Sequence, residues 1–208
     1  MIVCWAAKGG SGTTVVACAL ALGAARAQPS LLVDLAGDCA TALGLQDATG
    51  PGAVDWLASP TAGPADLARL GVTVRDEVRL IPRGDGCPPD DQWARLAAAL
   101  SGPTNVIVDA GTGSPPQALL DAAEQSLLVT RPCFIAIHRA RRLTIRPTGV
   151  VLVDEPGRAL TSSDVEHALG VPVVAEVRFD PAVARAVDAG LLIARLPRSL
   201  VVSLRCAA

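Results

Sequence analysis

The chain has 208 residues, which is enough for one domain with a substantial core. Half of the residues are apolar but only 2% are aromatic, and this predicts an aliphatic core like that of a parallel sheet covered by helices on both faces. The formal net charge of -2 excludes a general attraction of the whole surface to nucleic acid.

Cysteine usage and the amino-terminal segment set further limits. The six cysteines form no CxxC pair and there are only two histidines, so we expect no zinc or iron–sulfur site. The polar run that begins at Lys8 interrupts the apolar start too early for a secretory signal. No stretch approaches 18 uninterrupted apolar residues, so we expect no membrane span and a cytoplasmic globular protein.

Short apolar runs alternate with helical patterns along the chain. The expected strands are 2–6, 31–35, 78–81, 106–109, 126–130, 149–153 and 173–177. The expected helices are 13–27, 90–100, 116–123, 135–143, 162–169 and 181–189. This alternation predicts an α/β fold with a doubly wound, mostly parallel sheet flanked by helices. Residues 46–66 are rich in Gly, Pro, Ala and Thr and are expected to form a long loop or a small excursion, which is not enough for a second domain, so 1–208 is expected to be a single domain.

Lys8 is the only lysine among the 18 basic residues; the others are arginines. It opens the run Lys8-Gly9-Gly10-Ser11-Gly12-Thr13-Thr14, directly after the first apolar strand. A compact ammonium on a flexible stem differs chemically from a rigid guanidinium. The position therefore indicates a loop that binds phosphate.

A glycine-rich turn between a strand and a helix directs backbone N–H groups and the positive end of the helix dipole at an anion. Gly9, Gly10 and Gly12 permit the tight turn, and Thr14 offers a hydroxyl to Mg²⁺. A glycine-rich turn with no ligand is the alternative. A dinucleotide-binding G-x-G-x-x-G turn is disfavoured because its third glycine would fall at Val15.

The loop resembles the deviant Walker A motif of the MinD/ParA-type ATPases, whose usual form is KGGxGK[ST]. Later segments resemble the same family in chain order: Leu32-Val33-Asp34 its first switch, Val106 to Gly113 its Walker B strand and second switch, Leu128 to Pro132 the next strand, and Ala168 to Val183 its late segment. The Gly-Thr-Thr ending resembles the CpaE/TadZ branch, which is associated with placing pilus or secretion machinery and with septum-site control.

This resemblance implies a homodimer that sandwiches ATP and Mg²⁺, with Lys8 reaching the phosphates bound by the partner copy. It implies catalytic roles for Lys8, Asp34 and Asp109. Metal ligation is expected from Thr14, Asp34 and Asp109. Nucleotide contacts are expected from Gly9, Gly10, Ser11, Gly12, Thr13, Thr14, Gly113, Asp154 and Arg178. Gly113 would donate its N–H to the γ-phosphate, and Asp109 would hold Mg²⁺ through water; an Asp109 that only caps the next turn is the alternative.

The chain departs from the family pattern where hydrolysis and base recognition are concerned. Thr13 replaces the lysine that pairs with the β- and γ-phosphates, and Ala36 replaces an acid that positions water. Each loss of this kind costs a few kcal/mol of transition-state stabilisation, so we expect feeble hydrolysis or none. Asp154 and Arg178 differ from the residues common beside the base, which leaves adenine specificity open.

Two further segments bear on partners. The stretch from His138 to Arg142, with Arg146, is the densest basic region, and we interpret it as a solvated helix face, a non-specific DNA contact or a contact with an acidic partner. The tail from Leu200 to Arg205 is a poor candidate for a membrane anchor because it has no lysine and no bulky aromatic residue, so we expect no strong membrane binding.

We therefore expect an ATP-binding dimerisation switch that positions cellular machinery (pilus or secretion apparatus, septum or DNA), acting with an unidentified protein partner. A nucleotide-free pseudo-ATPase scaffold is the alternative. A metabolic ligase of the dethiobiotin synthetase type is less favoured, because no polar substrate pocket can be assembled from the sequence.

Overall fold

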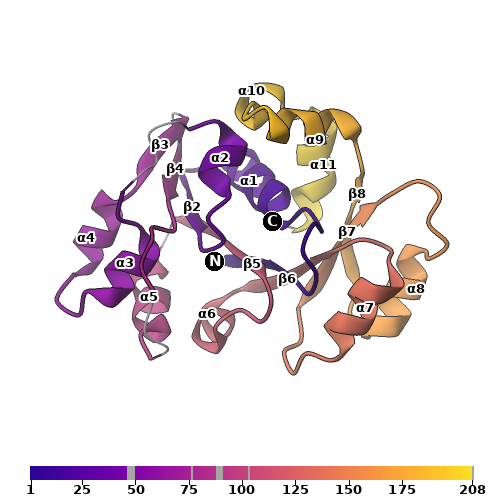
Figure 1. The fold of residues 1–208 in the computed structure, drawn as a ribbon, viewed down its shortest axis with the longest axis horizontal. Coiled ribbons are helices and arrows are strands. Elements are labelled where there is room, and N and C mark those ends of the chain that lie inside the picture. Colours follow the sequence, from indigo (N-terminus) through magenta and orange to yellow (C-terminus); the bar gives the residue numbers. More distant parts are fainter. Residues whose placement is uncertain (46–49, 76, 88–90, 103, 208) are drawn as a thin grey trace.

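The computed structural model describes residues 1–45, 50–75, 77–87, 91–102 and 104–207. An eight-stranded sheet of order β3-β4-β2-β5-β1-β6-β7-β8 forms the centre of the molecule (Figure 1). Its strands are β1 (Ile2–Ala6), β2 (Ser30–Asp34), β3 (Val72–Arg75), β4 (Val78–Ile81), β5 (Asn105–Thr112), β6 (Gln125–Thr130), β7 (Gly149–Asp154) and β8 (Val173–Arg178). β3 is antiparallel to β4, and every other described pair of neighbouring strands is parallel.

Helices cover both faces of this sheet, as Figure 1 shows. One face carries α1 (Thr13–Ala24), α2 (Cys39–Leu43), α9 (Pro181–Asp188), α10 (Leu192–Arg195), α11 (Arg198–Ser203) and the 3-10 turn η1 (Leu204–Ala207). The opposite face carries α3 (Ala53–Ala58), α4 (Pro64–Arg69), α5 (Trp93–Leu100), α6 (Gln117–Ala122), α7 (Phe134–Arg141) and α8 (Ser162–Leu169). The doubly wound, mostly parallel α/β fold predicted from the sequence is confirmed.

Each face of the sheet has its own aliphatic core, because the central strands bury side chains on both sides. In β1, Cys4 points to the core beneath α1, whereas Val3 and Trp5 point to the core beneath α3 to α8. The buried Trp5 indole N–H donates to the Ser126 hydroxyl at 2.9 Å, which ties β1 to β6. The middle of the sheet, where the loop after β1 begins, is therefore fixed by packing and by a buried polar contact.

Of the two alternatives predicted for 46–66, a long loop or a small excursion, the long loop is wrong for the part that the structure describes, which contains α3 and the start of α4. Both short helices begin at a glycine whose N–H donates to an aspartate three residues on: Gly52 to Asp55 at 2.8 Å and Gly63 to Asp66 at 2.7 Å. An acid in the first turn also suits the helix dipole. These local contacts outweigh the loop-forming composition.

Other predicted elements agree with the structure within a few residues. The first helix ends at Ala24 instead of residue 27, and the helix predicted from residue 90 begins at Trp93. Residue 90 lies outside the described residues. The edge strand β3 was not predicted. Within the described ranges, no helix has the length and apolar character needed to cross a bilayer.

Candidate nucleotide-binding site

The loop between β1 and α1 presents free backbone N–H groups at the carboxyl edge of the sheet. Gly10 and Gly12 have positive φ angles of 74° and 98°, which favour glycine strongly. The Ser11 hydroxyl donates to the Lys8 carbonyl at 2.7 Å and closes the turn. Gly12 caps α1 without a side-chain hydrogen bond, and the first turn of α1 contains no acid. The helix N-terminus is therefore left open for an external anion.

Two cavities flank this loop and share Gly10 and Gly12. The first, which we call the polar cavity, has a volume of about 490 Å³. Its lining combines the loop with the segments after β2 and within β5: Gly10 to Val15, Leu35, Ala36, Asp38 and Ala110 to Thr112. The second, which we call the apolar cavity, has a volume of about 420 Å³ and lies toward β7, β8, α9 and α11.

Beneath the polar cavity, the parallel register places two aspartates side by side. Asp34 ends β2 opposite Asp109 of β5, and Asp109 is opposite Cys4 of β1. The ligand atoms of Asp34, Asp109 and Cys39 all lie within 4.8 Å of one another. The structure thus brings together the two aspartates predicted as metal ligands, and it adds a thiol that sequence reasoning did not connect with them.

Asp34 is already engaged by the backbone of its own loop. One carboxylate oxygen accepts the N–H groups of Ala36 at 2.9 Å and Gly37 at 2.6 Å, and the other accepts the Cys39 N–H at 2.8 Å. These bonds favour the ionised form, but burial has the larger effect and raises the pKa of Asp34. In this conformation Asp34 shapes the loop after β2, so metal ligation would have to use its remaining lone pairs.

Asp109 is the better placed acid for a cation. It is fully buried; its Oδ1 accepts the Gly111 N–H at 3.0 Å, and its Oδ2 contacts the Cys39 Sγ at 3.5 Å. Burial raises the pKa of Asp109, and the Thr14 hydroxyl counteracts the rise by stabilising the carboxylate. A buried acid beside a hydroxyl, and with a second acid nearby, is a donor set suited to Mg²⁺.

No basic side chain lines the polar cavity among the described residues. Thr13 and Thr14 both line it, and Thr13 is the position where the resembled family has a lysine. Lys8 lines neither cavity, and its Nζ approaches the Gly9 carbonyl at 3.3 Å. A polyphosphate in the polar cavity would therefore meet backbone N–H groups, hydroxyls and acids, and its charge would need neutralisation from a cation or from another chain.

The structure does not support the role expected for Gly113. Its N–H donates to the Ala6 carbonyl at 2.8 Å, and Gly113 is not among the lining residues of either cavity. Gly111 and Thr112 line the polar cavity instead. A γ-phosphate contact through Gly113 would require the segment after Asp109 to move.

The apolar cavity is walled by aliphatic side chains of α1, β7, β8, α9 and α11, with Phe179 at one side. Arg178 lines this cavity, and so does Arg131, which directly follows β6. Asp154 is opposite Arg178 in the strand register but is exposed and is not among the lining residues; its carbonyl accepts the Phe179 N–H at 2.7 Å. A largely apolar cavity with a few polar groups is typical of a site for a small organic molecule.

Sequence reasoning did not identify the distant contributors to this cavity. α11 supplies Ser199, Leu200 and Ser203, the preceding Pro197 also lines the cavity, and α9 supplies Val183, Ala184 and Val187. The apolar face of α11 also packs on α1, where Val201 approaches Gly23. The tail considered as a membrane anchor thus contributes its apolar face to the fold.

Among the described side chains of the basic stretch, His138, Arg139, Arg141, Arg142 and Arg146 are exposed. They belong to α7 and the segment after it, beside Phe134 and Ile135, which are 73% and 55% exposed. The location fits either a solvated face or a contact surface.

Known proteins resemble this chain in structure. No protein-family model matches the chain, and no curated protein sequence matches it. The crystal structure of a ParA family ATPase from Chlorobium tepidum TLS superposes with a TM-score of 0.76 at 18% identity, covering 98% of this chain and 95% of that one. MinD from the MinC:MinD cell division complex of Aquifex aeolicus gives 0.77 at 17% identity (98% and 93% covered). The septum site-determining protein MinD from Pyrococcus horikoshii OT3, complexed with Mg-ADP, gives 0.74 at 18% identity (97% and 91% covered).

These similarities define the fold: the chain has the P-loop NTPase fold of the MinD/ParA-type ATPases. At such low identity they establish architecture alone, so function has to be argued from the site.

Proposed function

We propose that the chain is a cytoplasmic MinD/ParA-like switch that binds ATP and Mg²⁺, dimerises on binding, and positions other cellular machinery with weak or absent ATP hydrolysis. The observation that carries the proposal is the open N-terminus of α1, which faces a cavity with Thr14 and Asp109 beneath it. The adjacent apolar cavity has the size and character suited to a nucleoside.

The residues fit the proposed ligands. At Gly10 a side chain would meet nothing within 4 Å, so the loop is an open cradle, and at Gly12 a Cβ would point toward Val153 of the apolar cavity. Thr14 and Asp109 would hold Mg²⁺, with Asp34 supporting the loop beside them. When bound, Mg²⁺ would neutralise phosphate charge that this chain's polar cavity does not neutralise by itself.

Lys8 is proposed to act on the nucleotide of a second copy. It lines neither cavity of its own chain, and its ammonium has a weak backbone contact at 3.3 Å, so it remains available to another molecule. In a dimer, the Lys8 of each copy would bring positive charge to the polar cavity of the other copy, which has no basic lining residue among the described residues. Dimer formation would then depend on the nucleotide, since without phosphate the lysine has no anion to meet.

Feeble hydrolysis follows from what lines the polar cavity. Thr13 offers a hydroxyl where a lysine would stabilise the transferring phosphoryl group, and Ala36 offers no carboxylate to position water. Such a protein would act by binding and releasing its partners and not by catalytic turnover. We propose an unidentified protein partner; the structural relative from Aquifex aeolicus is in complex with MinC. Placement of pilus or secretion machinery, suggested by the CpaE/TadZ-like loop, and non-specific DNA binding by the basic stretch are the finer proposals.

The test is nucleotide-dependent dimerisation measured by analytical ultracentrifugation with Mg·ATP, Mg·ADP and no nucleotide. Wild type is expected to dimerise with Mg·ATP, and Lys8→Ala is expected to weaken the dimer about 10- to 100-fold. Lys8→Arg keeps the charge but not the compact ammonium, so it should recover only part of the loss. A wild-type chain that binds Mg·ATP yet stays monomeric would refute the switch.

A nucleotide-free scaffold is the second candidate, and one observation favours it. The polar cavity is lined by Asp38 and lies above two buried acids, with no basic lining residue in the described chain. This electrostatic environment opposes a triphosphate. Calorimetry at high Mg·ATP concentration separates the two candidates, because the scaffold predicts no heat of binding.

A further inference from the structure

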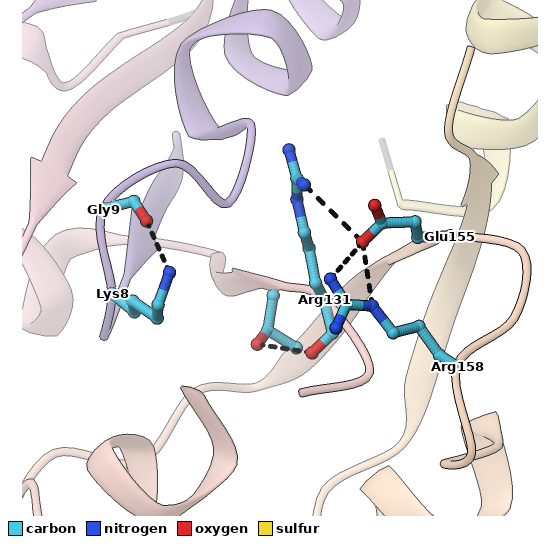
Figure 2. A network of polar contacts seen from close by, with 6 residues as sticks. Lys8, Gly9, Arg131, Glu155 and Arg158 are labelled. Atoms are coloured by element: carbon cyan, nitrogen blue, oxygen red, sulfur yellow. Dashed lines mark hydrogen bonds and ion pairs between the residues drawn. The ribbon is translucent and has the colours of Figure 1, made fainter. Parts of the chain in front are cut away.

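Arg131 follows β6 directly and extends beside the phosphate-binding loop (Figure 2). Its side chain lines the apolar cavity together with Gly10 and Gly12 of that loop. The guanidinium carbon lies 5.1 Å from the centre of the Phe179 ring, a cation–π contact that holds the group against the cavity wall. The side chain is 30% exposed, so it is partly removed from water but not enclosed.

The polar contacts of Arg131 are incomplete. Its Nη1 lies 3.7 Å from the Glu155 Oε2, which is longer than a hydrogen bond. The same Glu155 oxygen accepts the Arg158 Nε–H at 2.9 Å, so Arg158 is its main partner, as Figure 2 shows. The Nε of Arg131 is buried and has no acceptor among the described residues. Buried donors in proteins are normally satisfied, so this unpaired N–H makes the ligand-free arrangement costly, and the guanidinium would have to turn for the N–H to reach an acceptor in the cavity.

The ligand argued above supplies acceptors at this place. A nucleotide over the loop has phosphate oxygens near Gly10 and Gly12, and a guanidinium binds phosphate through two parallel N–H groups. Arg178 also lines the cavity, but it is exposed, so water already solvates it. The polar cavity offers no cation to the same phosphates within the described chain. Arg131 is therefore the basic side chain that both needs an acceptor and shares a cavity with the loop.

We propose that Arg131 is a phosphate-binding residue of the nucleotide site, which replaces the charge that Thr13 does not provide. This inference rests on the proposed function. Glu155 is its competitor: the carboxylate attracts the guanidinium when no nucleotide is bound and loses it when phosphate enters. Nucleotide binding would thereby loosen Glu155 from β6, so the loop after β7 would register whether the site is loaded.

The test compares Arg131→Gln, Arg131→Lys and Glu155→Gln by calorimetry with Mg·ATP, Mg·ADP and adenosine. Arg131→Gln is expected to lower Mg·ATP affinity about 10- to 100-fold, the size of a charge-assisted hydrogen-bond pair. Arg131→Lys should fall between wild type and Arg131→Gln. Glu155→Gln should raise the affinity about two- to fivefold, because it removes a partly exposed competitor. Arg195→Gln, on an exposed position of α10 and outside both cavities, is the matched charge control and should change nothing.

A phosphate contact predicts that Mg·ATP affinity falls in Arg131→Gln and rises in Glu155→Gln, whereas a packing role does not predict these opposite changes. If Arg131 only supports the Phe179 wall, Arg131→Gln will weaken adenosine as much as Mg·ATP, and this result would overturn the proposal. An Arg131→Gln variant that binds Mg·ATP within twofold of wild type would overturn it too, while leaving the nucleotide site intact. A wild-type chain that binds no nucleotide would instead remove the proposed function. Should Arg131→Gln fail to fold, Arg131→Lys and Glu155→Gln still decide the question.

Discussion

The apolar and polar cavities lie on either side of one loop, yet they differ in how complete they are. The apolar cavity has an aliphatic enclosure, an aromatic wall and two arginines. The polar cavity has hydroxyls and the acid Asp38 in its lining but no basic lining residue in the described chain. Asp34 beneath it is occupied by backbone N–H groups. A site can therefore retain what is needed to hold a nucleoside while lacking much of what accelerates phosphoryl transfer.

The largest expected effect comes from filling the apolar cavity. Ala184 of α9 lines it, so Ala184→Trp should place an indole where the nucleoside would lie. We expect Mg·ATP affinity to fall at least about 100-fold, or about 2.7 kcal/mol. Ala182→Trp is the control, because Ala182 is exposed on the same helix and is not a lining residue. Calorimetry measures both variants; equal affinities for Ala184→Trp and wild type would place the nucleoside elsewhere.

The polar cavity can be tested by restoring what it lacks. Thr13→Lys should tighten Mg·ATP binding about tenfold, because an ammonium gains charge-assisted contacts with phosphate. Thr13→Met has a similar length without the charge and should give no gain. Titration calorimetry reports both values. A lysine that leaves affinity unchanged would mean that phosphate does not lie over the N-terminus of α1.

Adding the second missing group should recover hydrolysis. Ala36 lines the polar cavity and lies against Gly111, so an aspartate there would face the space above Asp109. We expect Thr13→Lys combined with Ala36→Asp to raise steady-state phosphate release at least about 100-fold over wild type, the scale of a single restored electrostatic contact. Thr13→Lys with Ala36→Asn has the same shape without the carboxylate and should remain slow. Rapid ATP turnover by the wild-type chain would contradict the inference that the polar cavity lacks groups needed for hydrolysis.

The smallest expected effect is on stability and depends on pH. Burial raises the pKa of Asp109 above the ordinary 3.8, so the folded chain binds this proton more tightly than the unfolded chain. The contribution of Asp109 to stability therefore falls as pH rises from about 3.8 through the folded value, and stays low above it. Without Mg²⁺, Asp109→Asn should melt about 2–4 °C higher than wild type near pH 7.5, as 1 kcal/mol would produce in a domain of this size.

The melting difference should shrink toward zero as the pH falls below 3.8, because Asp109 of the unfolded chain then also becomes protonated. Mg²⁺ should narrow it at neutral pH by stabilising wild type alone. Asp38→Asn changes an exposed acid at the same cavity and should shift the melting temperature little. If Asp109→Asn melted below wild type at every pH, the carboxylate would be a structural anchor and not a retained functional group.

Local patterns in the sequence predict much of this fold. β1, β4 and α8 begin and end where the apolar runs and the Thr161–Asp164 capping pair place them. β3 was not predicted because its exposed and half-buried residues alternate over only four positions at the sheet edge. α3 and α4 lie in a region rich in Gly and Pro, and this composition favoured a loop. Signals of helix starts were nevertheless present: Asp55 and Asp66 in the first turns, and Pro64 as the first residue of α4.

The same distinction applies to the site. The loop from Lys8 to Thr14 is contiguous, so its chemistry can be read from the chain. Arg131, Phe179 and the lining residues of α11 meet only after the sheet and helices assemble, and no spacing in the sequence relates them. The hydrogen bonds that occupy Asp34 and Gly113 are likewise properties of loop conformation, which residue type alone does not determine.

Cys39 gives the buried acids a chemical reporter. Its thiol is fully buried against Asp109, and the neighbouring Cys18 and burial keep its pKa well above the usual range. An alkylating reagent can reach this sulfur only when α2 separates from the sheet, so the rate of labelling measures how often that region opens. A ligand that clamps the loop after β2 would slow the labelling of Cys39, and peptide mass spectrometry would separate this site from the exposed Cys87 and Cys206.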